Sequence, residues 1–360
     1  MTNKLFDIAG QFLTEGGIVE IKPLGEGFIN DTYRITTENG QPDYLLQRKN
    51  KNVFPDVPAM MENIVAVTGH IKKKVSDPLR ETLTVIRAFD GKPYYKDDEG
   101  EFWAVSLFID NTLSYFTADT PELARQGGIG IGRFHKQLYD FTEPLSEVIR
   151  GFHDIRWRFS QWDEALRADR AGRVRELAEE ISWVESRRER MMQFKMLIEN
   201  GTIPRKVSHN DTKISNILFN ADDRSVLCAI DLDTVMNSTV LFDVGDALRS
   251  YTNLAAEDEP DLGKVEMSPD MFKAWIEGYL SENSDTLSQA ETDNLAFSGL
   301  YITYEQMLRF LMDYINGDTY YRIHYKEHNL VRTRSQHKLL QSMEEQYEKM
   351  CGIVNGLVRK

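Results

Sequence analysis

The chain has 360 residues, 41% of them hydrophobic, with a formal net charge of -14 and a sequence pI near 5.1. A chain of this size buries a sizeable core and is expected to divide into two lobes. The negative charge argues against a surface for nucleic acid or anionic membranes, because it repels polyanions. The two cysteines, Cys228 and Cys351, offer neither a disulfide framework nor a CxxC metal site, so a cytoplasmic location is expected.

The first 110 residues show the two-residue alternation and turn signals of a small, mostly antiparallel sheet. Residues 1–17 predict a short amphipathic helix and not a secretory signal. A second helix is predicted within residues 54–75, where Pro58 marks its start. The strand candidates are residues 17–24, 29–37, 44–49, 82–89, 93–97 and 101–109.

From residue 111 onward the apolar residues recur at helical spacing, which predicts a mainly helical second lobe. The expected fold class is therefore α+β, with lobes at residues 1–110 and 111–360. No window reaches the roughly 18 apolar residues of a membrane span, so no membrane partner is expected, and a monomer is favoured. The helical segments are 121–141, 155–199, 268–280, 291–315 and 332–354, with one strand-rich interruption at 214–235.

Two segments imitate binding motifs. The glycines of "GGIGIG", residues 127–132, suggest a dinucleotide loop, but no strand precedes them and the helical spacing continues through them, so close helix packing is favoured. His135 in the same segment is interpreted as a packed or capping histidine. The charge-rich stretch 165–190 is interpreted as a solvated helix face with ion pairs.

The segment "VSHNDTKISNILF", residues 207–219, carries the strongest signal for chemistry. It is followed by a turn, "NADDRS", and a returning strand, "VLCAI", which together predict a hairpin. The residues that enter and leave such a hairpin lie at one end of it, so Asn216 and Asp231 are expected to meet. Asp211, in the preceding loop, is within reach of the same point.

A carboxylate, an amide oxygen and a second carboxylate provide the oxygen ligands that Mg²⁺ prefers, with phosphate completing the shell. The spacing H-x-D-x4-N matches a kinase catalytic loop, in which the aspartate orients the attacking hydroxyl and the asparagine binds metal. His209 is interpreted as a structural hydrogen-bonding residue of this loop. Gly25 and Gly27, between two predicted strands, then suit a flap over nucleotide phosphates, although glycines at a simple hairpin turn would look the same.

The motifs "GEGFINDTY", "HNDTKISN", "AIDLDT" and "LFDVGDALR" resemble the aminoglycoside phosphotransferase and choline kinase superfamily, which has a protein-kinase-like fold. The longer segments "VSHNDTKISNILF", "IDLDTVM", "RFLMDYINGDTYY" and "EHNLVRTRSQ" look most like the N-acetylhexosamine 1-kinases. The resemblance implies an ATP- and Mg²⁺-dependent enzyme that phosphorylates the anomeric hydroxyl of GlcNAc or GalNAc. Its partners would be a small sugar and MgATP.

The resemblance also implies roles for single residues. Asp211 would be the base and Asn216 and Asp231 the metal ligands, with Asp233 an additional candidate. The backbone of Phe108 and Ile109 would hydrogen-bond adenine. Asn30, Arg309 and Tyr320 would contact the sugar, although Arg309, in an apolar helix, equally suits a structural ion pair.

The sequence departs from the family pattern at the third strand, where a lysine is expected to reach the phosphates. Gln47 aligns there and is followed by Arg48 and Lys49; alternation sends Gln47 and Lys49 to one face and Arg48 to the other. Glu62 is the one acidic candidate for pairing with such a lysine. Phe28 in the flap stands where the N-acetylhexosamine 1-kinases have a polar ring. The identity of the acceptor sugar, including the preference for an acetamido group, therefore stays open.

Two rival functions stay open on the sequence. One is a superfamily kinase for another hydroxyl acceptor, such as homoserine, choline, methylthioribose or an aminoglycoside. Choline would call for an aromatic cage. The other is a nucleotide- or sugar-binding protein without turnover, which the missing strand lysine motivates.

Overall fold

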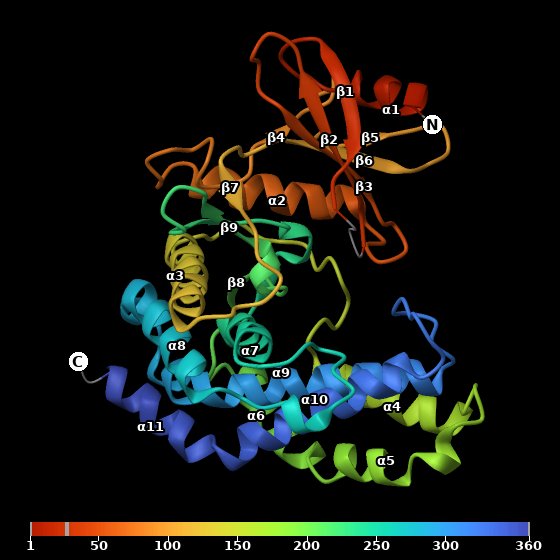
Figure 1. Cartoon of the computed structure of the whole chain (residues 1–360), viewed down its shortest axis with the longest axis vertical. Helices are drawn as coiled ribbons and strands as arrows, with labels where there is room; N and C mark the ends of the chain where they lie inside the picture. Colours follow the sequence, from red (N-terminus) through yellow and green to blue (C-terminus); the bar gives the residue numbers. More distant parts are fainter. Residues whose placement is uncertain (1, 26–28, 359–360) are drawn as a thin grey trace. The chain divides into compact units, whose positions relative to one another are not determined.

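The computed structural model describes residues 2–25 and 29–358, and the chain forms two compact units (Figure 1). The first unit comprises Met1–Leu113, Gln137–Arg150 and Leu218–Asn237. The second comprises Ser114–Lys136, Gly151–Ile217 and Ser238–Lys360. Each unit is therefore built from segments that lie far apart in the sequence.

The sheet of the first unit is antiparallel throughout, with the strand order β1-β2-β3-β6-β4 and β5 paired to β6. Its inner face buries Ile35, Leu46 and Val105, and the N-terminal helix adds Ile8 to this core. The elements are α1 (Thr2–Ala9), β1 (Ile18–Pro23), β2 (Asp31–Thr37), β3 (Tyr44–Lys49), α2 (Val57–Ile71), β4 (Val85–Ile86), β5 (Tyr95–Lys96) and β6 (Phe102–Leu107). The predicted antiparallel sheet with one long helix is confirmed.

The strand predicted at residues 82–89 is confined to Val85–Ile86 in the structure, and the prediction was wrong at both ends. After β4 the backbone leaves the sheet and pairs with the segment that follows α1. Phe12 and Ala88 form an isolated bridge there, and the Phe89 amide donates to the Gln11 carbonyl at 2.9 Å. The N-terminal segment therefore takes the hydrogen bonds that a longer β4 would have made.

The predicted hairpin is present, with strand order β10-β9-β7. Its strands are β7 (Thr112–Leu113), β9 (Ile217–Asn220) and β10 (Val226–Ala229). The turn contains Arg224 in the left-handed region, and the Asp223 carboxylate accepts the Ser225 amide at 2.9 Å. Because the Asp223 carboxylate caps its own turn in this way, the segment "NADDRS" is able to reverse the chain.

The second unit is helical and is built around α9 (Gln289–Ile315), which is buried along most of its length and packs on α7 and α10. Its N-terminus carries a capping box between Ser288 and Glu291. The other helices are α3 (Pro121–Leu138), α4 (Ile155–Ala168), α5 (Ala178–Glu185), α6 (Arg188–Glu199), α7 (Val240–Tyr251), α8 (Pro269–Asn283), α10 (His328–Glu345) and α11 (Tyr347–Val358); β8 (Lys206–Ser208) and β11 (Met236–Ser238) are short strands.

The single helix predicted at residues 332–354 is two helices, α10 and α11, which meet at Gln346. The Gln346 side chain donates to the carbonyl of Met267 at 2.9 Å, a contact that ties the break to the segment before α8. In residues 2–25 and 29–358 no helix is both long and apolar enough to cross a membrane.

The glycines of residues 127–132 lie inside α3 and serve helix packing, as predicted. A Cβ at Gly128 would lie 2.1 Å from the Trp275 carbonyl oxygen on α8. Conversely, a Cβ at Gly278 would lie 2.1 Å from the carbonyl oxygen of Arg125 on α3. The two backbones therefore touch at a distance that only glycine permits.

Replacing Gly128 with alanine should lower the free energy of unfolding by about 3 kcal/mol, because the added methyl group overlaps a backbone atom that cannot rotate away. Gly352 on α11 is a matched control, since a Cβ there meets nothing within 4 Å. Gly352→Ala should leave stability unchanged or raise it by about 0.5–1 kcal/mol. Urea titration of both variants measures the difference; equal stabilities would contradict the packing interpretation.

Candidate active site

The catalytic-loop motif follows β8 in the second unit and passes through a short 3₁₀ turn, Ile214–Asn216. The Asp211 carboxylate receives two hydrogen bonds on its Oδ2 atom: Lys213 Nζ donates at 2.7 Å and Asn216 Nδ2 at 2.9 Å. Asn216 Nδ2 also donates to the Asp211 carbonyl at 2.8 Å. Both amide hydrogens of Asn216 thus point at Asp211, and its Oδ1 is left to act as an acceptor.

These neighbours set the charge of Asp211. Burial by itself would raise the pKa of this carboxyl, but the charge and hydrogen bond of Lys213, with smaller contributions from His209 and Asn216, lower the pKa below its ordinary value. Asp211 is therefore ionised at neutral pH and able to accept a proton. Sequence reasoning did not single out Lys213, although its position two residues after the base is a local signal.

His209 supports the backbone of the loop. Its ring Nδ1 accepts the amide of Asp211 at 3.3 Å, and its own amide donates to Asp243 Oδ2 at 2.7 Å. The ring is buried and packs edge-on against Phe134 of α3. His209 therefore holds the peptide that carries Asp211.

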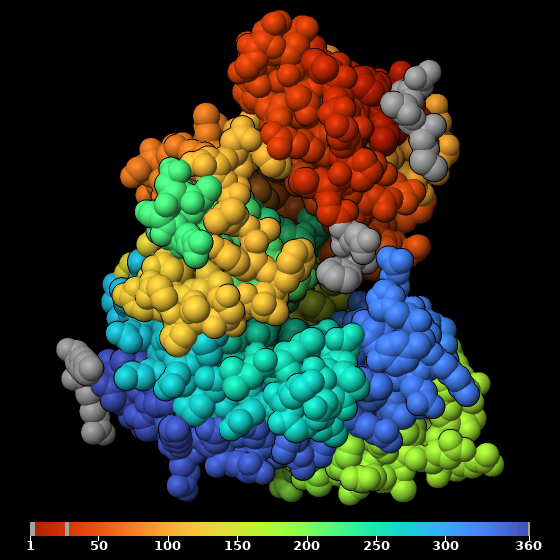
Figure 2. All heavy atoms as spheres, in the orientation of Figure 1, coloured from red at the N-terminus to blue at the C-terminus, as the bar shows by residue number. Residues whose placement is uncertain are grey.

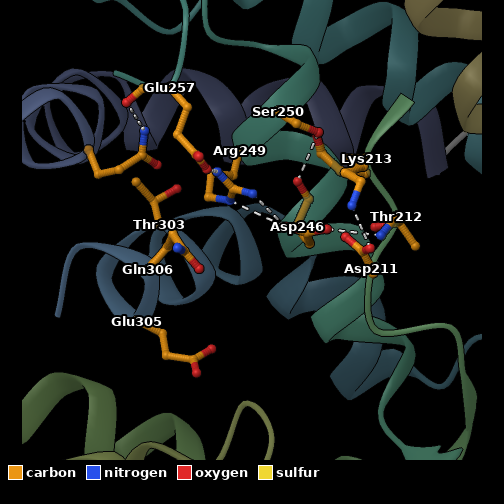
Figure 3. Close-up of polar contacts among 12 residues, drawn as sticks. Asp211, Thr212, Lys213, Asp246, Arg249, Ser250, Glu257, Thr303, Glu305 and Gln306 are labelled. Carbon is orange, nitrogen blue, oxygen red and sulfur yellow. Dashed lines mark hydrogen bonds and ion pairs between the residues drawn. The ribbon is translucent and has the colours of Figure 1, made fainter. Parts of the chain in front are cut away.

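Two acids of α7, Asp243 and Asp246, accept backbone amides of the catalytic loop. Neither of them was assigned a role from the sequence. Asp243 is fully buried and accepts the amides of His209 and Asn210, at 2.7 and 2.6 Å, and His135 Nε2 at 2.7 Å. Asp246 accepts the Thr212 amide at 2.9 Å (Figure 3). The signal that could have found them is a pair of acids within an apolar helix, since buried carboxylates need partners.

Arg249 extends this cluster toward the surface loop between α7 and α8. Its guanidinium donates to Asp246 Oδ1 at 3.0 Å and to Glu257 Oε1 at 2.5 Å (Figure 3). Asp258, the next residue, accepts from His328 of α10 at 2.7 Å. The loop forms much of one face of the second unit, where it is coloured turquoise in Figure 2. It is thus tied to both α7 and α10.

Arg309 and Tyr320, both predicted to contact the sugar, lie together in the second unit. The Arg309 guanidinium faces the rings of Phe152, Tyr320 and Tyr321 at 5.5, 5.9 and 5.6 Å. Its Nη1 donates to Gln306 Oε1 at 3.2 Å. Asp313 shapes the loop that carries the tyrosines, because its carboxylate accepts the amides of Tyr320 and Tyr321 at 2.8 and 3.0 Å. Tyr320 itself is 59% exposed.

On the first unit, the three polar residues at the end of β3 have different surroundings. Lys49 is 3% exposed, and its Nζ lies 2.8 and 3.0 Å from the two oxygens of Asp233. It also donates to Gln47 Oε1 at 2.8 Å, which confirms that these two side chains share a face. Arg48 instead pairs with Asp31 at the surface.

The acid partner suggested for a strand lysine was Glu62, and this suggestion was wrong. Glu62 is exposed on α2, whereas Lys49 pairs with Asp233. Asn63, the next residue of α2, faces inward and donates to the carbonyl of Val235 at 2.9 Å. The helix therefore contacts the segment after β10 through an amide and not through a carboxylate.

Asn30 is buried, and both ends of its side-chain amide are used. Its Nδ2 donates to Asp233 Oδ2 at 2.8 Å, and its Oδ1 accepts the Asn50 amide at 3.1 Å. Asp231, two residues after β10, has a left-handed backbone (φ 59°) and precedes the 3₁₀ turn that contains Asp233. The two acids of "DLDT" thus differ: Asp233 is buried and paired to Lys49, and Asp231 is half-buried.

The remaining residues predicted to contact the nucleotide belong to the segment after β1 and to the end of β6. Gly25 is exposed with φ +68°, while Gly27 and Phe28 lie outside the described residues. The Phe108 amide donates to the Asp43 carbonyl at 2.9 Å, and the Ile109 carbonyl accepts the Thr112 hydroxyl at 2.9 Å. An adenine would therefore have to use the other two groups, the Phe108 carbonyl and the Ile109 amide.

Comparison with known proteins identifies the family. Residues 20–266 match the phosphotransferase enzyme family, and this match covers more than half of the chain. The chain belongs to this family. The predicted superfamily and the phosphotransferase class are confirmed, while the acceptor stays a prediction.

Solved structures agree on the fold of this phosphotransferase. A microcompartment-associated aminopropanol kinase is similar with a TM-score of 0.67 at 15% identity, over 97% of this chain and 98% of that one. A choline kinase from Cryptosporidium parvum Iowa II gives 0.60 at 15%, over 99% of each chain. Spectinomycin phosphotransferase, in complex with ADP and spectinomycin, gives 0.58 at 14%, over 99% and 98%. The fold is thus kinase-like, with an antiparallel-sheet lobe and a helical lobe, as predicted.

Proposed function

We propose that this phosphotransferase transfers the γ-phosphoryl group of ATP to the 1-hydroxyl of an N-acetylhexosamine, GlcNAc or GalNAc, and releases ADP and the sugar 1-phosphate. The observation that supports it best is the state of Asp211, an ionised carboxylate oriented by Lys213 and Asn216 within an H-x-D-x4-N loop. Phosphoryl transfer requires little covalent help, so positioning and charge neutralisation supply most of the rate. Asp211 accepts the proton of the attacking hydroxyl.

Asn216, Asp231 and Asp233 are the proposed ligands of a magnesium ion. The carboxylate of Asp231 and the amide Oδ1 of Asn216 are hard ligands of the type that Mg²⁺ takes. Asp233 would have to exchange Lys49 or Asn30, which engage its two oxygens, to become a further ligand. Residues 2–25 and 29–358 contain no group of three or more His, Cys, Asp or Glu side chains placed to hold a metal ion, but Mg²⁺ on a nucleotide needs only one or two carboxylates beside the phosphate oxygens. When bound, the ion would neutralise the negative charge of the phosphates.

Nucleotide contacts are proposed for Gly25, Gly27, Gln47, Phe108 and Ile109, with Lys49 added because of its place on β3. The Lys49 ammonium is buried and donates to Asp233 and Gln47, and it would have to exchange one of these acceptors to contact a phosphate. Its presence weakens the rival reading of a protein without turnover, which rested on a missing strand lysine.

Acceptor contacts are proposed for Arg309 and Tyr320, and the Arg309 cluster bears on the choice of acceptor. A choline-type site needs an aromatic cage around an external cation. Here the aromatic rings of Phe152, Tyr320 and Tyr321 already surround a protein cation, the Arg309 guanidinium. A second positive charge would be repelled, so a neutral or anionic acceptor such as a sugar is favoured over choline or an aminoglycoside. A sugar contact of Asn30 remains a prediction, since its side-chain amide already hydrogen-bonds Asp233 and the Asn50 backbone amide.

The test is a coupled ADP-release assay with MgATP and a panel of GlcNAc, GalNAc, glucose, galactose, homoserine, methylthioribose, choline and one aminoglycoside. We expect turnover with the N-acetylhexosamines and a phosphorus NMR doublet that places phosphate on the anomeric oxygen. Turnover confined to homoserine, methylthioribose or a cationic acceptor would overturn the sugar assignment and keep the phosphotransferase. ATP binding without turnover on any acceptor would overturn the proposed reaction.

A further inference from the structure

The short segment between α3 and α4 reaches the catalytic loop. His153 is 4% exposed and has a left-handed backbone (φ 56°), two residues after Gly151 (φ 64°). Its ring Nε2 lies 3.1 Å from the carbonyl oxygen of Asn210, the residue directly before Asp211. The peptide between residues 210 and 211 is thus held at its oxygen by His153 and at its N–H by His209.

The other ring nitrogen of His153 faces a second acceptor. Nδ1 lies 2.5 Å from Oε2 of Glu305, which is 1% exposed in the middle of α9. The second carboxylate oxygen of Glu305 accepts from Arg158 Nε at 3.1 Å. A buried carboxylate that receives a guanidinium is ionised, because protonation would forfeit this charge-assisted bond.

Counting hydrogens fixes the state of the ring. Both nitrogens of His153 face oxygen acceptors, one a carbonyl and the other a carboxylate. A neutral imidazole has a single N–H, and would leave a lone pair directed at one of these oxygens. Both contacts are satisfied only when each nitrogen carries a hydrogen. Burial by itself would lower the pKa of His153, but Glu305 and the Asn210 carbonyl raise it, in agreement with this count.

We propose that His153, as an imidazolium held by Glu305, is a positioning residue that fixes the peptide bearing the base Asp211. This rests on the proposed function, because it assigns Asp211 the proton transfer. A base must stay within a few tenths of an ångström of its hydrogen-bonding position to be effective. His153 secures that position without touching the substrate.

The same network contacts the proposed acceptor site. The Phe152 ring lies tilted beside the His153 ring, with centroids 4.2 Å apart, and faces the Arg309 guanidinium at 5.5 Å. Arg309 is also one helical turn after Glu305 on α9. The charged groups that act on His153 are therefore Glu305 and Arg309, and Arg158 acts through its bond to Glu305, while Tyr301 donates to the His153 carbonyl at 3.0 Å.

Glu305→Gln tests this role by removing the counter-charge at constant shape. Arg158 and Arg309 then disfavour a charged His153, so its pKa should fall into the assay range. We expect kcat of this variant to drop about tenfold as pH rises from 6 to 8.5, relative to the wild type, with KM for MgATP unchanged. Glu199→Gln is the matched control, because Glu199 pairs with Arg156 at the surface of the same unit; its pH profile should match the wild type.

His153→Gln keeps one donor but cannot titrate. This variant should lower kcat by the same factor at every pH between 6 and 8.5. Urea titration will show whether it folds. A Glu305→Gln profile that follows the wild type at every pH would overturn the proposal. So would a His153→Gln variant that folds and turns over at the wild-type rate.

Nitrogen-15 NMR of the histidine side chains tests the charge without turnover. We expect one histidine, absent in His153→Gln, to keep hydrogens on both ring nitrogens at pH 8 in the wild type and to lose one in Glu305→Gln. A singly protonated ring at pH 8 in the wild type would overturn the proposal. Turnover missing from the wild type, with the imidazolium present, would instead overturn the proposed function.

Discussion

Replacing Asp211 with asparagine should lower kcat by about 10²- to 10⁴-fold while nucleotide binding stays near that of the wild type. The change removes the negative charge and the proton acceptor at almost constant volume. Asn216 and Lys213, which donate to Asp211 Oδ2 at 2.9 and 2.7 Å, would then face a neutral amide. Steady-state ADP release gives kcat, and titration with a fluorescent ATP analogue gives the affinity.

Asp223→Asn is the control for this change. Asp223 is an exposed acid in the turn of the β9–β10 hairpin, where it accepts from Ser225. The same substitution there should alter kcat by less than about twofold, because it leaves the catalytic loop untouched. An Asp211→Asn enzyme with unchanged turnover would show that another group accepts the proton.

The parts of the fold that could be predicted depend on local signals. β3 begins and ends where the alternation placed it, at Tyr44 and Lys49, and its first four residues alternate between buried and partly exposed. The β9–β10 hairpin follows from two apolar runs and a turn whose Asp223 side chain closes it. The H-x-D-x4-N loop is equally local, since the proposed base, Asp211, and Asn216 are five residues apart.

Contacts between distant segments could not be predicted in this way. Strand alternation put Gln47 and Lys49 on one face, but the partner of Lys49 is Asp233, 184 positions later. The sequence around Asp233 offers no sign of that partner. The strand lysine therefore looked absent at Gln47, although Lys49 lies two residues later on the same face of the strand.

Helix α7 shows a second limit. Its residues "LFDVGDALR" combine an apolar face with two acids, and they were read as a motif and not as a helix. Asp243 and Asp246 are stable inside because backbone amides from the catalytic loop, more than 30 residues earlier, satisfy them. The contact between His153 and Glu305 could not be predicted either, since the two residues are 152 positions apart and neither lies in a recognisable motif.

Replacing Asp243 with asparagine should lower the free energy of unfolding by about 3–5 kcal/mol. Its oxygens accept the amides of His209 and Asn210 and the ring of His135. An asparagine has only one oxygen, so its NH₂ group must face one of these donors, and that donor loses its partner in a buried site. Urea unfolding followed by circular dichroism measures the loss.

The same variant should lose activity even where it remains folded, because the Asp243 carboxylate accepts the backbone amides of His209 and Asn210 in the catalytic loop. Asp270, an exposed acid in the first turn of α8, is the control, and Asp270→Asn should change stability by less than about 0.5 kcal/mol. An Asp243→Asn protein as stable as the Asp270 variant would mean that the donors find other acceptors. In that case the loop would be held mainly by Asp246, whose oxygen accepts the Thr212 amide.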